Sequence, residues 1–343
     1  MAFYLRKSTF YGDDRHNSVG RHGNPFSFYK LVFSRSCITL NHVQVSPVLL
    51  HNNPANILRN TLKLKALLID LNGTLHIGSD PTPSAVQALT RLRQARIPFI
   101  FCSNSTKESS LCPLGKLKGM GFEARKEELL TSLGACKMLV EERGYKRPLL
   151  LMSPSAQEEF ASFSDSAPYD SVILGLHPQS LSYEPLNRAF RVLKGEPLST
   201  QDSEDKSKAE PALIAPHAAM YMQDPGSSSL LPGLSLGIGP FVRALEESTG
   251  TKAEIVGKPT RSFFELALER LKALGGEEWD VGEVAVVGDD VENDLGEGAR
   301  ELGLKRVLVK TGKYRQGVER TTEYPPDHVY DTFANLVDDL AQQ

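Results

Sequence analysis

A buried strand that ends at one carboxylate places the strongest constraint on the fold of this chain. The apolar run Ala66–Ile69 leads into Asp70, and a turn containing Gly73 and Thr74 follows at once. Such runs are typical of central strands in parallel sheets, and α/β proteins carry their chemistry at the carboxyl ends of these strands. The run therefore predicts a strand that delivers Asp70 to the functional edge of a sheet.

Strand-like and helix-like segments alternate from residue 65 onward, which predicts an α/β fold with a doubly wound, Rossmann-like parallel sheet. Strands are predicted at 65–70, 97–102, 149–152, 171–174, 212–215, 253–256, 283–287 and 306–309. Predicted helices include 84–95, 127–142, 183–193 and 261–274. The polar stretch 199–210 is expected to form an exposed loop.

Composition narrows the classes of function. A net charge of −3 over 343 residues gives no reason to expect nucleic acid or an anionic membrane as partner. No apolar run approaches the roughly 20 residues that span a bilayer. The four cysteines form no CxxC pair, which favours a reducing compartment such as the cytoplasm. Residues 1–61 are rich in arginine and poor in acids, so a transit peptide and a mitochondrial location are the alternative to a disordered leader.

Polar and charged side chains follow four of the predicted strands, and these residues are Asp70, Ser103, Asn104, Lys258, Asp289 and Asp290. Because carboxyl ends of parallel strands meet at one edge of a sheet, we expect these side chains to converge. Carboxylates suit Mg²⁺, and a lysine with short polar donors suits a phosphate. Each residue alone is also explained as a helix cap, a turn residue or a surface lysine, so the prediction depends on their occurring together.

With these motifs the chain resembles the haloacid dehalogenase superfamily of Mg²⁺-dependent phosphotransferases. Its signatures are an Asp-x-Asp-Gly-Thr loop, a Ser or Thr after the second strand, a Lys and a Gly-Asp-Asp loop. The segments 103–109, 237–241, 256–259 and 309–314 bring the chain closer to the subgroup with a large α/β cap. The resemblance implies a core at 63–144 and 253–343, a cap at 145–252, and a leader or transit peptide at 1–62. Related capped phosphatases often dimerise through the cap, so a homodimer is expected.

The resemblance also implies the metal-binding and nucleophilic residues. Asp70 would be the nucleophile that forms an aspartyl-phosphate. The side chains of Asp70 and Asp289 and the backbone carbonyl of Asn72 would bind Mg²⁺. Asp290 and Asp294 would support the metal from the acidic loop, one of them through water.

The phosphate-binding residues follow from the same resemblance. Ser103 and Asn104 would hold phosphoryl oxygens, and Lys258 would pair with both the nucleophile and the phosphate. The substrate would be a small phosphorylated compound or a phosphorylated protein side chain.

Asn72 departs from the pattern, because most members carry there the second acid of the loop, which protonates the leaving group. An amide cannot exchange a proton, and loss of general acid–base catalysis costs about 10²–10⁴ in rate. Members that resemble this chain most carry serine there, and at least one is a working phosphatase. We therefore expect a phosphatase that favours pyrophosphate, phosphohistidine or phospholysine over alkyl esters. The alternative is a catalytically weak pseudophosphatase that binds phosphate or phosphoproteins.

Other functions fit the sequence less well. Hydrolysis of haloacids needs no Mg²⁺, so Asp289 and Asp290 argue against it. No GxGxxG follows the first strand, which disfavours a dinucleotide-binding oxidoreductase. His76 is the nearest spare proton carrier but is expected to be structural. His217 and Tyr221 are expected as cap residues that face the substrate.

Overall fold

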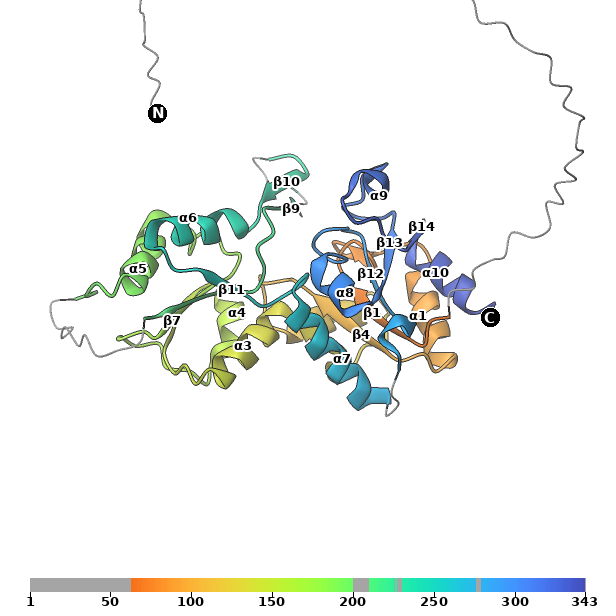
Figure 1. The fold of residues 1–343 in the computed structure, drawn as a ribbon, viewed down its shortest axis with the longest axis horizontal. Helices are drawn as coiled ribbons and strands as arrows, with labels where there is room; N and C mark the ends of the chain where they lie inside the picture. Colours follow the sequence, from red (N-terminus) through yellow and green to blue (C-terminus); the bar gives the residue numbers. More distant parts are fainter. Residues whose placement is uncertain (1–62, 200–209, 225, 227–229, 276–278, 343) are drawn as a thin grey trace, which may run out of the picture. The chain divides into compact units, whose positions relative to one another are not determined.

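The computed structural model describes residues 63–199, 210–224, 226, 230–275 and 279–342 (Figure 1). The predicted leader at 1–62 and nearly all of the loop predicted at 199–210 lie outside the described residues. No helix in the described ranges is both long and apolar enough to cross a membrane.

The larger sheet has six parallel strands in the order β14-β13-β12-β1-β4-β5. The strands are β1 (Ala66–Asp70), β4 (Phe99–Ser103), β5 (Leu129–Thr131), β12 (Val284–Gly288), β13 (Lys305–Val309) and β14 (His328–Tyr330). Strand β1 lies between β4 and β12, so the chain builds the sheet outward from β1 in both directions. This reversal of strand order is where open α/β sheets place their ligands.

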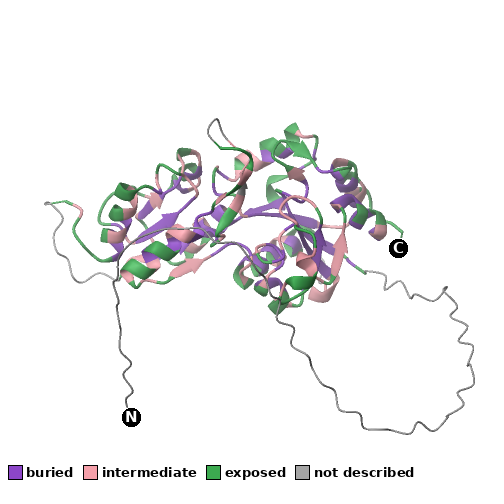
Figure 2. Cartoon of the chain, turned by 90° about the horizontal axis from the view of Figure 1, so that it is seen from above, coloured by how far each residue is buried: buried purple, intermediate pink, exposed green. Residues whose placement is uncertain are grey.

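Helices cover both faces of this sheet, because its central strands are apolar on both sides. Leu67 and Ile69 of β1 belong to one buried cluster, and Ala66 and Leu68 belong to the other. The first cluster is completed by α1 (Ala85–Gln94), α2 (Leu111–Gly119) and α10 (Phe333–Leu340). The second is completed by α3 (Ser132–Glu142), α7 (Arg261–Gly275) and α8 (Glu297–Leu302). The doubly wound parallel sheet predicted from the sequence is therefore confirmed, and Figure 2 shows its central strands as buried.

A second sheet of four parallel strands, in the order β11-β8-β7-β6, forms an inserted α/β unit that we call the cap. Its strands are β6 (Pro148–Leu151), β7 (Ser171–Leu174), β8 (Ala212–Ala215) and β11 (Ala253–Ile255). Helices α5 (Tyr183–Leu193) and α6 (Gly239–Thr249) share a buried cluster with β6, β7 and β8. A hairpin of β9 (Tyr221–Asp224) and β10 (Gly233–Leu236) precedes α6.

Two local predictions differ from the structure. Strand β11 was expected in the first sheet, but it pairs with β8 at the edge of the cap sheet. Its residues are only half-buried, as an edge strand allows, whereas all five residues of β12 are buried. The helix predicted at 127–142 begins only at Ser132, because residues 129–131 form β5 beside β4. The hydroxyl of Thr131 accepts a hydrogen bond from the backbone N–H of Gly134 and so caps α3.

Candidate active site

The candidate site lies at the carboxyl edge of the six-stranded sheet. Asp70 ends β1, Ser103 ends β4, and Asp289 follows β12 directly. These strands are neighbours, with Ile69 of β1 opposite Val287 of β12. The sheet therefore brings together side chains that are far apart in the sequence.

Three carboxylates meet at this edge, and we call Asp70, Asp289 and Asp294 the acid group. One oxygen from each lies within 4.8 Å of the others, and all three side chains are buried. The ammonium of Lys258 donates hydrogen bonds to Asp70 Oδ1 at 2.6 Å and to Asp294 Oδ1 at 2.8 Å. Lys258 is only 1% exposed, so its charge is balanced almost entirely by these two carboxylates.

Two loops, one after β1 and one after β13, are packed against the acid group, and glycines make this possible. Gly73 has a φ of +103°, and a Cβ there would lie 2.0 Å from Asp289 Oδ2. Gly312, from the loop after β13, would place a Cβ 2.1 Å from the same oxygen. The Thr311 hydroxyl donates a hydrogen bond to the Gly73 carbonyl, which holds these two loops together.

The side chain of Asn104 binds the backbone of Lys258 and does not point into the site as a free ligand. Its side-chain oxygen accepts from the Lys258 N–H at 3.0 Å, and its side-chain nitrogen donates to the Lys258 carbonyl at 2.9 Å. Ser103 lies beside it, and its hydroxyl accepts from the backbone N–H of Ser105 at 3.2 Å. The amide of Asn104 thus fixes where the Lys258 side chain begins.

The electrostatics of the acid group point to a missing positive charge. Burial, followed by Asp294, raises the pKa of Asp70 to about 6, although Lys258 opposes this. Burial and the carboxylates of Asp294 and Asp70 raise the pKa of Asp289 well above its usual range. Burial also acts to raise the pKa of Asp294, but Lys258 and Lys313 outweigh it and lower that pKa. The site is therefore too negative for all of its carboxylates to ionise easily by themselves.

A divalent cation fits this arrangement. Asp289 Oδ1 is buried and has no hydrogen-bond partner within the described part of the chain, which is costly for a carboxylate oxygen unless something binds it. The acid group and Asp290 supply four carboxylates, and Lys258 and Lys313 supply two ammonium groups. Two negative charges remain, which one divalent cation neutralises, and clustered carboxylate oxygens are the ligands that such hard cations prefer.

Asp290 is placed differently from Asp294, although the sequence suggested similar roles. Its carboxylate accepts from the backbone N–H groups of Glu292 at 3.1 Å and Asn293 at 2.9 Å. It also accepts from the Asn293 side chain at 2.8 Å, so it mainly stabilises the turn after β12. Asp294, four residues on, reaches Lys258 instead.

Sequence reasoning gave no role to Lys313, which the structure places at this site. Its backbone N–H donates to Asp289 Oδ2 at 2.6 Å, and its ammonium lies 3.3 Å from Asp290 Oδ2. The four acids Asp294, Asp290, Asp289 and Asp70 together outweigh burial and raise the pKa of Lys313. The segment 309–314 could have drawn attention to Lys313, because it is one of the segments in which the chain resembles the capped subgroup. It suggested no function for this lysine.

Asn72 is exposed, and its backbone forms a bridge with His76 at the base of a short hairpin. His76 Nδ1 lies 3.0 Å from the Gly78 carbonyl, a local contact that fits the structural role expected for this histidine. The hairpin consists of β2 (His76–Ile77) and β3 (Asp80–Pro81).

The cap brings His217 close to the charges of the site, whereas Tyr221 is 54% exposed on the hairpin β9–β10. Burial, followed by the charges of Lys313 and Lys258, lowers the pKa of His217 to about 4. The Nδ1 atom accepts from the Ala219 N–H at 3.3 Å, so the neutral ring carries its proton on Nε2.

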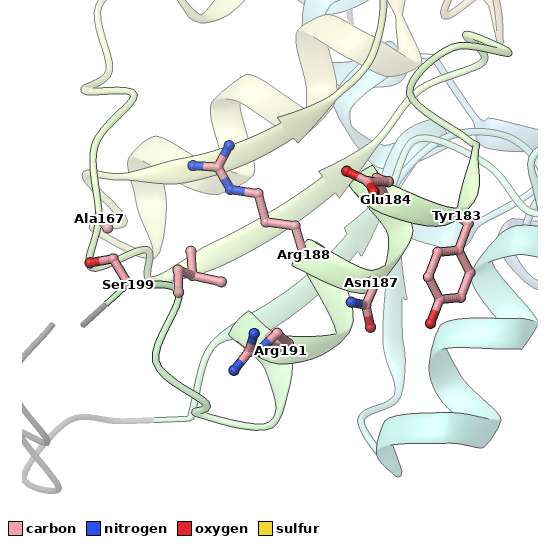
Figure 3. A pocket seen from close by; sticks show the side chains of 8 residues that line it. Ala167, Tyr183, Glu184, Asn187, Arg188, Arg191 and Ser199 are labelled. Carbon is pink, nitrogen blue, oxygen red and sulfur yellow. The ribbon is translucent and has the colours of Figure 1, made fainter. Parts of the chain in front are cut away.

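A surface hollow of about 410 Å³ lies elsewhere, along α5 of the cap (Figure 3). It is lined by Ala167, Tyr183, Glu184, Asn187, Arg188, Arg191, Leu198 and Ser199. None of the sequence-predicted site residues lines it, so it has no part in the chemistry at the sheet edge.

Comparison with known proteins agrees with this geometry. A family model described as haloacid dehalogenase-like hydrolase matches residues 67–164, and a HAD-hydrolase-like model matches residues 255–336. Human haloacid dehalogenase-like hydrolase domain-containing protein 2 is 40% identical over 280 residues, 81% of this chain and 96% of that protein. The chain belongs to the haloacid dehalogenase-like hydrolases. It is a hydrolase of the phosphatase type.

Two further similarities support the family and its fold. Human phospholysine phosphohistidine inorganic pyrophosphate phosphatase is 31% identical to this haloacid dehalogenase-like hydrolase over 283 residues, 81% of the chain and 95% of that protein. The crystal structure of 4-nitrophenylphosphatase from Thermotoga maritima superposes with a TM-score of 0.67 at 23% identity. It covers 80% of this chain and 97% of its own, so the arrangement of core and inserted cap is shared.

Proposed function

We propose that this phosphatase depends on Mg²⁺, forms an aspartyl-phosphate on Asp70, and cleaves phosphoanhydride or P–N bonds such as those of pyrophosphate, phosphohistidine and phospholysine. The observation that carries the proposal is the unpaired Asp289 Oδ1 within a buried acid group that has too few positive charges. A dedicated phosphate binder has no need of such a site beside a lysine-paired carboxylate.

The residues divide the reaction between them. When bound, Mg²⁺ would neutralise phosphoryl oxygens and so allow a carboxylate to approach the phosphorus. Asp70 and Asp289, with the Asn72 carbonyl, would hold it, and Asp294 would support them. A carboxylate oxygen of Asp70 attacks phosphorus, and the bond to the leaving group breaks with its electron pair on that group. Water then attacks phosphorus, the bond between phosphorus and Asp70 breaks with its electron pair on the carboxylate, and the proton of the water passes to solvent.

Three other residues bind the phosphate or position the residues that bind it. Lys258 orients Asp70 through the 2.6 Å hydrogen bond and stabilises the charge of the phosphoryl oxygens. Ser103 donates its hydroxyl to a phosphoryl oxygen. Asn104 acts through Lys258, because both polar ends of its amide bind the backbone of that lysine. We therefore assign Asn104 to positioning, with its backbone available to phosphate.

Asn72 narrows the substrate class. Without an acid at this position, the leaving group must depart without a proton, and phosphate leaves pyrophosphate as a stable anion. The 31% identical relative is named for phospholysine, phosphohistidine and inorganic pyrophosphate, which supports the same class here. Asn72 also favours the second candidate function, a phosphate-binding protein with little turnover.

The deciding experiment is release of phosphate from pyrophosphate and from p-nitrophenyl phosphate, with and without Mg²⁺. Asp70→Asn removes the nucleophile, and Asp338→Asn is the matched control, because Asp338 is an exposed acid paired with Arg91. We expect Mg²⁺-dependent release from the wild type and from Asp338→Asn, with a loss of at least about 10³-fold in Asp70→Asn. Release at the Asp70→Asn level in all three proteins, together with retained binding of inorganic phosphate, would establish the binding function instead.

A further inference from the structure

The segment 311–313 forms a wall of the active site that the proposed chemistry leaves unused. It follows β13 and is fixed at both ends, by Thr311 on the Gly73 carbonyl and by the Lys313 N–H on Asp289. Gly312 between them lies so close to Asp289 that no side chain fits. The backbone at Lys313 is therefore held firmly beside the acid group, and its side chain starts from a defined point.

The two lysines of the site differ in how tightly they are held. The ammonium of Lys258 is buried and makes two short hydrogen bonds. The side chain of Lys313 is 26% exposed, and among the residues that the structure describes its ammonium makes one contact, at 3.3 Å from Asp290 Oδ2. Lys258 is thus a fixed part of the site, whereas Lys313 retains room to move toward a ligand.

Asp290, the partner of Lys313, does not depend on that contact. Its carboxylate already accepts hydrogen bonds from the Glu292 and Asn293 N–H groups and from the Asn293 side chain. Departure of the Lys313 ammonium would therefore leave no unpaired buried carboxylate behind, and the contact costs little to exchange.

The ammonium of Lys313 also acts on the cap. It lowers the pKa of His217 more than Lys258 does, although burial is the largest cause of that shift. Both ammonium groups therefore act on the buried ring of His217, and Lys313 acts on it more strongly than Lys258 does. A leaving group must occupy the side of the phosphate away from Asp70, because the attacking and leaving oxygens of a phosphoryl transfer lie roughly in line.

We propose that Lys313 is a substrate-binding residue that pairs with negative charge on the leaving group and so selects phosphoanhydrides over esters with an uncharged leaving part. The inference rests on the proposed function and adds the residue that decides its specificity. It also explains how the site works with Asn72, because electrostatic stabilisation by an ammonium replaces protonation for leaving groups that depart as anions.

The test compares pyrophosphate with p-nitrophenyl phosphate at saturating Mg²⁺. Neither leaving group needs a proton, and only pyrophosphate carries charged oxygens on its leaving part. Lys313→Met removes the charge, Lys313→Gln is a second charge-removing variant, and Lys313→Arg retains the charge. Lys310→Met is the matched control, because Lys310 directly precedes the segment 311–313 and pairs with exposed Asp331 at 3.0 Å.

We expect Lys313→Met and Lys313→Gln to lose about 10- to 100-fold more kcat/KM on pyrophosphate than on p-nitrophenyl phosphate, the size of one charge-assisted hydrogen bond. Lys313→Arg should keep most of the preference, and Lys310→Met should behave as wild type. The Mg²⁺ concentration for half-maximal activity on p-nitrophenyl phosphate reports any damage to the acid group.

Equal losses on both substrates in the charge-removing variants would overturn the inference, because Lys313 would then act through the acid group alone. Wild-type activity on p-nitrophenyl phosphate without activity on pyrophosphate would also overturn it. Both outcomes leave the phosphatase mechanism intact. Absence of Mg²⁺-dependent activity on either substrate in the wild type would instead reject the proposed function itself.

Discussion

The amide at position 72 is the residue whose chemistry differs most from the rest of the site. In the proposed reaction, Asp70 is the nucleophile, Lys258 is its partner and Asp289 is a metal ligand, but Asn72 supplies no proton. Asn72 is exposed, and its bridge to His76 is made by the backbone. A charged side chain at position 72 therefore needs no repacking of its neighbours.

We therefore expect Asn72→Asp to increase kcat/KM on glycerol 3-phosphate by at least about tenfold, since general acid–base catalysis is worth about 10²–10⁴. The gain on pyrophosphate should be much smaller, because its leaving phosphate departs without a proton. Steady-state kinetics on both substrates measure the ratio of the two gains. Equal gains would show that leaving-group protonation does not limit this enzyme.

At the scale of single residues, the sequence predicted most of the side chains that the structure brings together at the sheet edge, but it could not distinguish the positions of the acids. Asp290 and Asp294 stand in one acidic loop, four positions apart. Only the turn after β12 decides that Asp290 binds backbone N–H groups while Asp294 faces Lys258. Lys313 was missed because a lysine in a loop after a strand is ordinarily solvated, and nothing local marks its approach to Asp289.

At the scale of elements, glycines decide whether the loops after β1 and β13 fit around the acid group. Gly312 and Gly303 both have positive φ, at +52° and +79°, so an added methyl group strains either backbone. A Cβ at Gly312 would overlap Asp289 Oδ2, whereas a Cβ at Gly303 meets no atom within 4 Å. The two positions therefore separate backbone strain from disruption of the site.

We expect Gly303→Ala to lower the free energy of unfolding by about 1 kcal/mol and to leave kcat unchanged. Gly312→Ala should in addition reduce Mg²⁺-dependent activity at least about tenfold and raise the Mg²⁺ concentration needed, because the segment 311–313 must move off Asp289. Thermal unfolding and a Mg²⁺ titration of activity measure both effects. Matching activities in the two variants would argue against close packing of this loop on the site.

The two errors at the element scale have one cause. Strands β11 and β5 are each only three residues long. So short a stretch gives too little alternation of apolar and polar residues to identify a strand or the sheet that it joins. Pairing with β8 and β4 settled that, through hydrogen bonds to segments far away in the sequence. The limits of the cap at residues 145 and 252 and the expected homodimer stay predictions.

At the scale of the whole molecule, His217 links the stability of the fold to pH. Burial, with Lys313 and Lys258, lowers its pKa from 6.5 to about 4. Between these values the unfolded chain binds a proton that the folded protein does not, so the free energy of unfolding falls as the pH falls through this window. The contribution of His217 to the free energy of unfolding is fully present above pH 6.5 and is lost progressively as the pH falls toward 4.

Between pH 7 and pH 5, we expect His217 to lower the unfolding free energy of the wild type by about 2 kcal/mol. The variant His217→Gln should lack this part of the decrease. Urea denaturation at the two pH values, in Mg²⁺, measures the difference between the proteins. A variant whose stability falls with pH as steeply as that of the wild type would show that the folded His217 is not held neutral.

The sequence by itself determined the α/β class, the strand that carries Asp70 and most of the residues that meet beside it. It could do so because buried parallel strands are long apolar runs, and because their carboxyl ends share one edge. Tertiary structure alone decided that Asn104 binds the backbone of Lys258, that Asp289 Oδ1 is left without a partner, and that Lys313 faces the acid group. These features depend on loops more than 20 residues apart in the sequence. Burial and charge at such loops depend on which segments pack together, and this packing produces no periodic pattern in the sequence.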